Sequence, residues 1–301
     1  MKTVNELLRE YRAGQQPAKG ERLQFSGACG KDVYNITAPF DFAGKTLIAG
    51  RMEERDSEAA HIGFFEKVQD DCYQLVEGTV DLPLQDPFVT FIGGKLILGG
   101  VETYPHPEDA TKLHWRTNFY EMKTLEEAGL LFKGPGGMKD LRLKELADGR
   151  LLVLTRPQGE KGGRGKIGVL YLSALEELST EKIEQAPLAY GNFLADEWGG
   201  ANEIYQLADG QIGVLGHIAR FDEHGDRHYY PITFTLKDQA LYDVKIIAER
   251  SNFAASPAKR PDLEDVVFSG GLHFLKDGTA YLYAGIADAT GQRIKIKHPF
   301  E

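Results

Sequence analysis

An internal repeat restricts the fold of this chain more than any other feature. Five segments share one pattern, in which a strand, a turn that ends in glycine and a second apolar strand follow one another: 37–51, 87–100, 141–156, 203–217 and 272–285. The DG and GG pairs in these turns favour tight hairpins, because glycine adopts a positive φ without strain. A unit that recurs along a chain is typical of repeat architectures such as solenoids and propellers.

Each hairpin is followed by another strand-like stretch, and most units add a fourth, such as GLLFKG. Units of this kind form small antiparallel sheets that close into a ring. We therefore predict an all-β, five-bladed β-propeller with a short N-terminal helix within 1–14. In this prediction 1–301 is a single domain, with 1–20 as helix and extension and 21–301 as the propeller. Segment 21–28 is expected to complete the last blade.

Composition narrows the possible partners. The 301 residues carry a formal net charge of −10, which disfavours nucleic acid because such binding requires clustered cations. Two cysteines, Cys29 and Cys72, give neither a disulfide framework nor a thiolate metal site. The histidines lack metal-ligand spacing, so we expect no metal and no cofactor.

The distribution of apolar residues argues against a membrane partner. No apolar run reaches spanning length, and residues 1–20 lack an apolar signal core. We therefore expect a cytoplasmic protein without a membrane partner. The sequence leaves its oligomeric state open.

The polar residues that flank the hairpins are expected to meet. The free ends of a hairpin lie on the same side, so residues just before its first strand lie near residues just after its second. These positions hold Asn35 and Arg51 at the first hairpin, Asp86 and Glu102 at the second, Lys139, Asp140 and Arg156 at the third, Trp198, Asn202 and His217 at the fourth, and Ser269 and Asp288 at the fifth. Carboxylates, amides, cations and an aromatic ring together are typical of a sugar-binding mouth. The alternative is that these ends are polar because the channel is wet.

Several motifs resemble one known family. They are GRMEERDSE at 50–58, QDPFVTF at 85–91, MKDLRLKELADGRLLVLTRP at 138–157, WGGANEIYQLADGQIGVLGH at 198–217 and YLYAGIADA at 281–289. Together they make the chain similar to glycosyltransferase family 108, a group of mannosyltransferases and phosphorylases. That group is related to the β-mannoside phosphorylases of glycoside hydrolase family 130. The similarity covers most of the chain.

The resemblance implies roles for individual residues. It makes Asp86 the catalytic acid. The phosphate ligands that it implies are Lys139, Arg156 and His217. The residues expected to contact the substrate are Asn35, Arg51 and Asp288 from the resemblance, and Asp140 and Asn202 from their places at the mouth.

The chain departs from the related phosphorylases at three positions. Those enzymes carry arginine at the place of Lys139, lysine at that of Trp198 and arginine at that of Phe88. The differences fall around the implied phosphate ligands. They leave the choice between inorganic phosphate and a nucleotide-sugar diphosphate open.

The chemistry follows from one acid opposite several cations. Phosphorolysis of a glycoside needs a proton donor for the leaving oxygen but no carboxylate base, because phosphate is already nucleophilic. We predict an inverting β-mannoside phosphorylase or mannosyltransferase acting on β-1,2-linked mannooligosaccharides, with inorganic phosphate as co-substrate. In the synthetic direction the donor is mannose 1-phosphate or GDP-mannose. The alternatives are a β-mannoside hydrolase, with Glu102 or Asp140 as second carboxylate, and a non-catalytic glycan-binding propeller.

Two charged segments have open roles. EERDSE at 53–58 lacks the spacing of a calcium loop and is expected to be a solvated turn. KGGRGK at 161–166 has glycines and cations without a P-loop context, and is expected to be a mobile rim loop. In that loop, Arg164 and Lys166 are candidates to clamp a donor phosphate.

Overall fold

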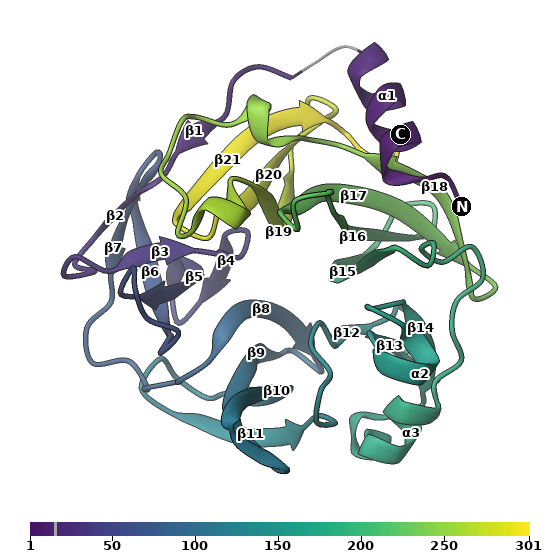
Figure 1. Ribbon diagram of the computed structural model, residues 1–301. Coiled ribbons are helices and arrows are strands. Elements are labelled where there is room, and N and C mark those ends of the chain that lie inside the picture. The colour runs from purple at the N-terminus through teal and green to yellow at the C-terminus, as the bar shows by residue number, and fades with distance from the viewer. Residues whose placement is uncertain (15–16) are drawn as a thin grey trace.

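Strands dominate the structure, and the predicted all-β class is confirmed. A computed structural model describes residues 1–14 and 17–301 and arranges the sheets in a ring (Figure 1). Within these residues, antiparallel pairing joins the strands into five groups that follow one another in the sequence. We number these groups one to five in chain order.

Groups one to three run from Asp32 to Leu172. Group one contains β3 (Asp32–Tyr34), β4 (Phe40–Phe42), β5 (Lys45–Glu53), β6 (His61–Gln69) and β7 (Cys72–Leu75). Group two contains β8 (Gln85–Ile92), β9 (Lys95–His106), β10 (Asp109–Met122) and β11 (Ala128–Lys133). Group three contains β12 (Arg142–Glu145), β13 (Leu151–Thr155) and β14 (Gly168–Leu172).

Groups four and five complete the ring. Group four contains β15 (Glu197–Gln206), β16 (Ile212–Phe221), β17 (Arg227–Lys237) and β18 (Ala240–Ile246). Group five contains β19 (Asp265–Phe274), β20 (Thr279–Ile286) and β21 (Thr290–Lys297). The helices in the connections are α2 (Gly159–Gly162), α3 (Thr180–Gln185) and three single 3₁₀ turns, η1 (Leu175–Glu177), η2 (Arg250–Asn252) and η3 (Pro261–Leu263).

The hairpins predicted from the repeat are confirmed. They are β4–β5, β8–β9, β12–β13, β15–β16 and β19–β20. Their turn glycines take the expected conformation, with φ of 73° at Gly94 and 84° at Gly210. A side chain at these turns would be strained, which is why the glycine signal located the hairpins in the sequence.

The predicted closing segment divides between two sheets. β1 (Glu21–Arg22) pairs with β21 and so extends group five, as expected for the closing strand. β2 (Gln24–Ser26) instead pairs in parallel with β7 of group one. The segment therefore ties the fifth group to the first, rather than belonging to the last sheet alone.

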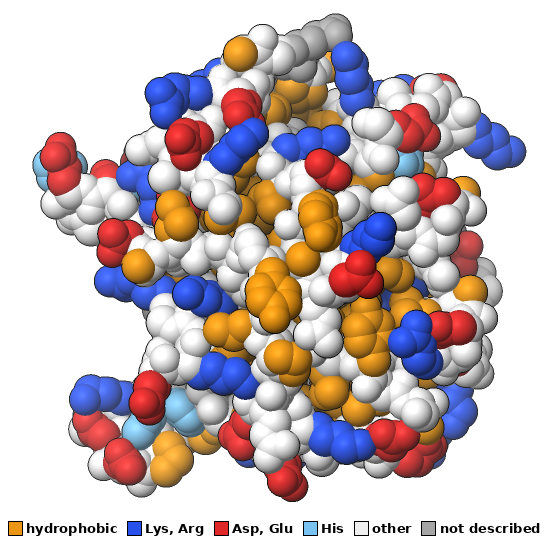
Figure 2. All heavy atoms as spheres, turned by 90° about the vertical axis from the view of Figure 1, so that its right-hand side faces the viewer, with side chains coloured by type: hydrophobic (Ala, Val, Ile, Leu, Met, Phe, Trp, Pro, Cys, Tyr) orange, Lys and Arg blue, Asp and Glu red, His pale blue; other side chains and the backbone are white. Residues whose placement is uncertain are grey.

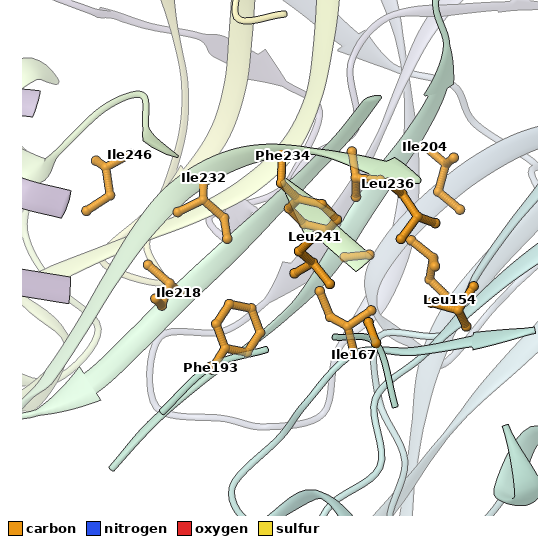
Figure 3. Packing of buried hydrophobic residues seen from close by; sticks show 14 of the residues in the cluster. Leu154, Ile167, Phe193, Ile204, Ile218, Ile232, Phe234, Leu236, Leu241 and Ile246 are labelled. Atoms are coloured by element: carbon orange, nitrogen blue, oxygen red, sulfur yellow. The ribbon is translucent and has the colours of Figure 1, made fainter. Parts of the chain in front are cut away.

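The expected N-terminal helix is α1 (Val4–Ala13), which lies outside the ring (Figure 1). Thr3 and Glu6 form a reciprocal capping box that satisfies free amides of its first turn. The apolar face, Val4, Leu7 and Leu8, is buried and joins a cluster that lies mainly between groups three and four. Figure 3 shows part of that cluster, where side chains of β15, β16 and β17 meet.

The outer surface is mixed in character. Figure 2 shows lysine and arginine interspersed with aspartate and glutamate on one side of the molecule, with apolar side chains between them. Intermixed charges favour solubility and do not mark a surface for nucleic acid. Within residues 1–14 and 17–301, no helix is long and apolar enough to cross a membrane.

In three hairpins the first strand is interrupted by an irregularity in its pairing. The pairing of β8 with β9 breaks between Gln85 and Phe88, that of β15 with β16 at Asn202, and that of β19 with β20 at Gly270. A bulge leaves a residue outside the ladder and turns its side chain away from the regular alternation. These irregularities lie next to the mouth positions singled out in the sequence.

Candidate functional site

The predicted residues meet in one cavity at a mouth of the ring. The cavity has a volume of about 430 Å³, inside the range of about 300–1,000 Å³ that is typical of small-molecule sites. The predicted site residues that line it are Asn35, Arg51, Asp86, Lys139, Asp140, Arg156, His217 and Asp288. They come from all five groups or the segments that flank them, so the ring brings distant stretches of chain together.

Four of these side chains depend on an unusual backbone conformation. Asn35, Asp86, Asp140 and Asp288 have positive φ values of 44°, 49°, 55° and 50°. Most side chains avoid this left-handed region, whereas Asn and Asp tolerate it. Because these residues depart from regular strand geometry, their side chains turn into the cavity.

Asp86 lies on what we call the acid side of the cavity, formed by Asn35, Arg51, Asp86 and Asp288. Its Oδ1 accepts hydrogen bonds from Nδ2 of Asn35 at 2.7 Å and from Nη1 of Arg51 at 3.3 Å. Both bonds end on the same oxygen. They hold the carboxyl group in one orientation, with 9% of the residue exposed.

A buried ionic network supports Arg51 from behind. Its Nη2 lies 2.9 Å from Oε2 of Glu53 and 3.2 Å from Oε2 of Glu58. Lys259, which precedes group five, also contacts Glu53 and lies 3.1 Å from Oε1 of Glu58. The hydroxyl of Tyr34 donates to Glu53 as well. The EERDSE segment is therefore not simply solvated, because it supplies anions that position a cation of the mouth.

Asp288 is the second carboxyl of the acid side. Burial raises its pKa to about 6; the charge of Arg51 opposes this rise, and the nearby charge of Asp86 adds to it. The acid side therefore retains a proton to a higher pH than an isolated aspartate would.

The other side of the cavity, which we call the cation side, is formed by Lys139, Asp140, Arg156 and His217. Oδ2 of Asp140 lies 3.4 Å from Nε of Arg156 and 3.9 Å from Nε2 of His217. Its Oδ1 lies 3.7 Å from Nη2 of the buried Arg142. Burial alone would raise the pKa of Asp140, but these neighbouring charges hold it below its ordinary value. Asp140 is thus an anion that keeps the cations in place.

His217 is enclosed at the inner wall of the cation side. Burial lowers its pKa to about 4, against the attraction of Asp140, so the ring is neutral near pH 7. Its Nδ1 lies 2.8 Å from Oδ1 of Asn202, and its ring stacks on Tyr229 with centroids 5.6 Å apart. Asn202 itself does not line the mouth cavity. It lies behind His217 and is 2% exposed. The structure therefore gives Asn202 a contact with His217 rather than the direct contact with substrate that the sequence predicted.

Two residues expected at the mouth lie elsewhere. Glu102 accepts from Nε of Arg116 at 2.6 Å and from Nδ2 of Asn118 at 3.0 Å, and is not among the described residues that line the cavity. The hydroxyl of Ser269 donates to the backbone oxygen of Gly216 at 2.8 Å. The expectation for Glu102 is wrong because β9 does not end where its pairing with β8 ends at Val101. It continues in the β9–β10 hairpin, where Glu102 pairs with Arg116.

Several lining residues were not predicted, because they come from long connections. Trp115 is on the long β9–β10 hairpin, and Arg260 precedes η3. Arg164, by contrast, was a candidate from the rim loop, and it lines the cavity just after α2; its guanidinium carbon lies 5.7 Å from the ring centroid of Trp198. Nε1 of Trp198 donates to the hydroxyl of Tyr229 at 2.9 Å, which fixes this aromatic wall. Trp115 and Arg260 carried no sequence signal, and Lys166, the other candidate of the rim loop, is not among the described residues that line the cavity.

The described residues contain no cluster of three or more His, Cys, Asp or Glu side chains placed to hold a metal ion. The acid side instead carries two aspartates beside Arg51, and the cation side carries Lys139 and Arg156 beside Asp140. It can therefore bind a polar ligand that carries hydroxyl groups and an anionic group together.

Known structures share this architecture. The chain is similar to MPT-4, a mannose phosphorylase from Leishmania mexicana solved with phosphate ion, at 34% identity over 99% of this chain and 93% of that chain, with a TM-score of 0.90. It is also similar to MPT-1, a GDP-Man-dependent mannosyltransferase from the same organism, at 31% identity over 99% and 95% of the two chains, with a TM-score of 0.89. The β-1,2-mannobiose phosphorylase of Listeria innocua shares the fold, at 14% identity over 93% and 91% and a TM-score of 0.62.

These neighbours confirm the resemblance found in the sequence motifs, and with the fold and the mouth cavity they define a carbohydrate-active enzyme. The chain belongs to the family described as protein of unknown function (DUF1861), whose pattern matches residues 10–301. A comparison with the sequences of curated proteins gave no match.

Proposed function

We propose that the protein is an inverting β-mannoside phosphorylase or mannosyltransferase, built as a single five-bladed propeller, with Asp86 as its catalytic acid. The observation that carries this proposal is the division of one cavity into an acid side and a cation side. The mannose phosphorylase and the mannosyltransferase to which the chain is similar support it. We further propose that the strand groups one to five are its blades.

The acid side protonates the leaving oxygen. Burial, assisted by the charge of Asp86, raises the pKa of Asp288 to about 6, so a proton is held next to Asp86 in weakly acidic solution. The leaving oxygen takes this proton as its bond to C1 of the mannosyl unit breaks, either directly or through a sugar hydroxyl. Asn35 and Arg51 fix Asp86 and also face the cavity, where they orient the sugar.

The cation side holds phosphate for attack. A phosphate oxygen forms a bond to C1 on the face opposite the leaving group, so the configuration inverts and a β-mannoside yields α-mannose 1-phosphate. Lys139 and Arg156 offset the charge of the phosphate, and Arg156 offers a planar fork suited to two of its oxygens. The reverse reaction transfers mannose from mannose 1-phosphate to a β-1,2-linked oligomannoside and releases phosphate. With GDP-mannose as the donor, the same transfer would release GDP.

Asn202 selects the form of His217 that can bind phosphate. A neutral histidine donates from Nε2 only if Nδ1 is the acceptor. Nδ2 of Asn202 is buried and has no hydrogen-bond partner among the described residues. With the amide turned over, Nδ2 donates to Nδ1 of His217 and the proton sits on Nε2, toward the cavity.

The geometry favours phosphate over water as the acceptor. A hydrolase needs a free carboxylate across from the acid to activate water. Glu102 is bound to Arg116 away from the cavity, and Asp140 is ion-paired with Arg156. Neither carboxylate is placed as a free base.

The test is an incubation of the full chain with mannose and either mannose 1-phosphate or GDP-mannose, with analysis of product and linkage. We expect a β-1,2-linked product, and phosphate-dependent cleavage of that product in the reverse assay. Product from GDP-mannose alone would assign the transferase activity. Mannose release that is indifferent to phosphate, or no reaction in any assay, would contradict the proposal.

A further inference from the structure

A second cavity lies inside the ring, behind the mouth cavity. It has a volume of about 130 Å³, and its walls come from all five strand groups, mainly from the first strands of their hairpins. One water needs about 10–15 Å³ of such space, so there is room for several. We call this the channel cavity; its polar lining residues are Thr37, Thr90, Arg142, Lys144, Asn202 and Glu203.

Two pairs of residues separate the channel cavity from the mouth cavity. Asn202 lines the channel cavity, and its Oδ1 lies 2.8 Å from Nδ1 of His217, which lines the mouth. Arg142 also lines the channel cavity, and its Nη2 lies 3.7 Å from Oδ1 of Asp140 at the mouth. A group in the channel cavity can therefore act on the cation side without touching a ligand in the mouth.

The backbone of Asn202 is fixed, but its amide group is not. Nε of Arg142 donates to the backbone oxygen of Asn202 at 2.7 Å. The side chain, by contrast, contacts only His217 among the described residues, and its Nδ2 has no hydrogen-bond partner there. An amide that turns over exchanges its acceptor oxygen for its donor nitrogen. Asn202 can therefore present either atom to His217 without moving the chain.

The two orientations place the proton of His217 on different nitrogens. With Oδ1 of Asn202 toward the ring, Nδ1 carries the proton and Nε2 presents a lone pair to the mouth, which repels an anion. With Nδ2 toward the ring, Nε2 carries the proton and donates to an anion. The other amide atom then needs its own partner on the channel side, a donor for Oδ1 or an acceptor for Nδ2.

Glu203 is the lining residue that can serve as either partner. Its Oε2 accepts hydrogen bonds from the hydroxyl of Tyr205 and from the backbone N–H of Leu272, the latter at 3.3 Å. Among the described residues no hydrogen bond ends on Oε1, and the residue is only partly buried where it lines the channel cavity. Oε1 is therefore available to water in the cavity, as a donor when protonated and as an acceptor when ionised.

The charged groups near Glu203 all come from one neighbouring strand. β12 supplies Lys144 and Arg142, which favour the ionised carboxylate, and β15 itself supplies the hydroxyl of Tyr205. The lining residues from groups one, two and five are uncharged. Desolvation outweighs these contacts and raises the pKa of Glu203 to about 7. Glu203 therefore changes from donor to acceptor near neutral pH.

We propose that Glu203 is a positioning residue for His217: through water in the channel cavity it sets the orientation of Asn202, and thereby the nitrogen at which His217 carries its proton. Protonated Glu203 donates toward Oδ1 of Asn202, so Nε2 of His217 donates to phosphate. Ionised Glu203 accepts from Nδ2, and the ring exchanges its proton with water to carry it on Nδ1. This inference rests on the role of His217 in the proposed function.

The first measurement follows anion binding across pH. Sulfate is the probe, because it keeps its charge where phosphate titrates. Glu203→Gln keeps the shape but cannot ionise. From about pH 6 to about pH 8, we expect sulfate affinity in the wild type to fall about three- to tenfold more than in this variant, the equivalent of one hydrogen bond.

Glu197→Gln is the matched control for this measurement. Glu197 is a buried carboxyl on the same strand, its pKa is also raised by burial, and it accepts from the backbone N–H of Val4. It does not line the channel cavity as the described residues define it. This variant should therefore keep the pH dependence of the wild type.

The second measurement reads the histidine proton directly. Nitrogen-15 spectra of the labelled histidine rings distinguish a protonated Nε2 from a protonated Nδ1, and His217→Ala assigns the signal. In the wild type we expect the proton on Nε2 at about pH 6 and on Nδ1 at about pH 8, with the change centred near the pKa of Glu203. Glu203→Gln should abolish this change.

The outcomes separate this inference from the proposed function. A His217 proton that stays on one nitrogen in the wild type, or a change that persists in Glu203→Gln, would overturn the role of Glu203 even where mannoside turnover supports the proposed function. A loss of sulfate affinity without a change of nitrogen would also overturn it, because the charge of Glu203 would then act directly. If His217→Ala binds sulfate and phosphate as tightly as the wild type, the phosphate site of the proposed function itself fails.

Discussion

The acid side and the cation side of the mouth each contain an aspartate with a left-handed backbone, but the two carboxyl groups differ in protonation. Asp288 and Asp140 both face the cavity, with φ of 50° and 55°. Yet burial and the charge of Asp86 raise the pKa of Asp288, whereas Arg156, His217 and Arg142 overcome burial and lower that of Asp140. The backbone places the carboxyl group, and its neighbours decide whether it carries a proton or a permanent charge.

The largest expected effect comes from removing the acid. Asp86→Asn keeps the shape and tolerates the left-handed backbone, but cannot donate the proton. We expect the turnover number to fall by about 10³-fold, within the range of about 10²–10⁴ for general acid catalysis. Initial rates of phosphorolysis measure the loss, and thermal unfolding serves as the control for folding. Full activity in this variant would remove Asp86 from the mechanism.

The next effect concerns the stability of the cation side. Arg156→Met leaves Asp140 with fewer partners in a buried site, and breaking such a pair costs about 3 kcal/mol of unfolding free energy. Asp140→Asn/Arg156→Met should recover part of that loss, because the unpaired charge is gone. Urea unfolding of both variants and of Asp140→Asn completes the cycle. A double variant whose loss equals the sum of the single losses would show that the two groups are not coupled.

The smallest expected effect is on the pH dependence of stability, which should differ between the acid side and the cation side. A raised pKa in the folded state means that Asp288 holds a proton which the unfolded chain releases, so its ionisation lowers stability as pH rises from about 4 to about 6. Asp288→Asn removes this cost and should stabilise the protein by about 2 kcal/mol above pH 6, and by little at pH 4.

Asp140→Asn is the matched control for this measurement. The lowered pKa of Asp140 contributes stability above the unfolded pKa that is lost as pH falls through the folded one. This variant should therefore be less stable at neutral pH and show a weaker loss in acid. Denaturant unfolding across pH measures both slopes. Parallel curves for the two variants would contradict the contrast between the sides.

Local signals in the sequence were sufficient for the hairpins and most of the mouth. Gly94 and Gly210 mark turns because few other residues adopt their conformation, and polar residues at hairpin ends must face water or a ligand. Glu102 was misplaced because the number of residues in a hairpin does not reveal where its partner strand stops. The register of β8 against β9 settles that question.

Contacts between distant segments could not be predicted. Lys259 reaches Glu53 across more than two hundred residues of chain, and nothing near Lys259 in the sequence marks it as part of the mouth. Trp115 and Arg260 line the cavity because long connections fold over it. The opposition of one acid to several cations was predicted from the sequence, but the ionic network behind Arg51 became visible only in three dimensions.

The left-handed conformation at Asp86, Asp140 and Asp288 also limits how such a site can change over evolutionary time. Glutamate would supply the same carboxylate but is disfavoured by the backbone, so the tolerated replacements are mainly asparagine and glycine. Both abolish the charge. A lineage can therefore lose this chemistry in a single step, whereas acquiring a different acid requires the main chain to be rebuilt first.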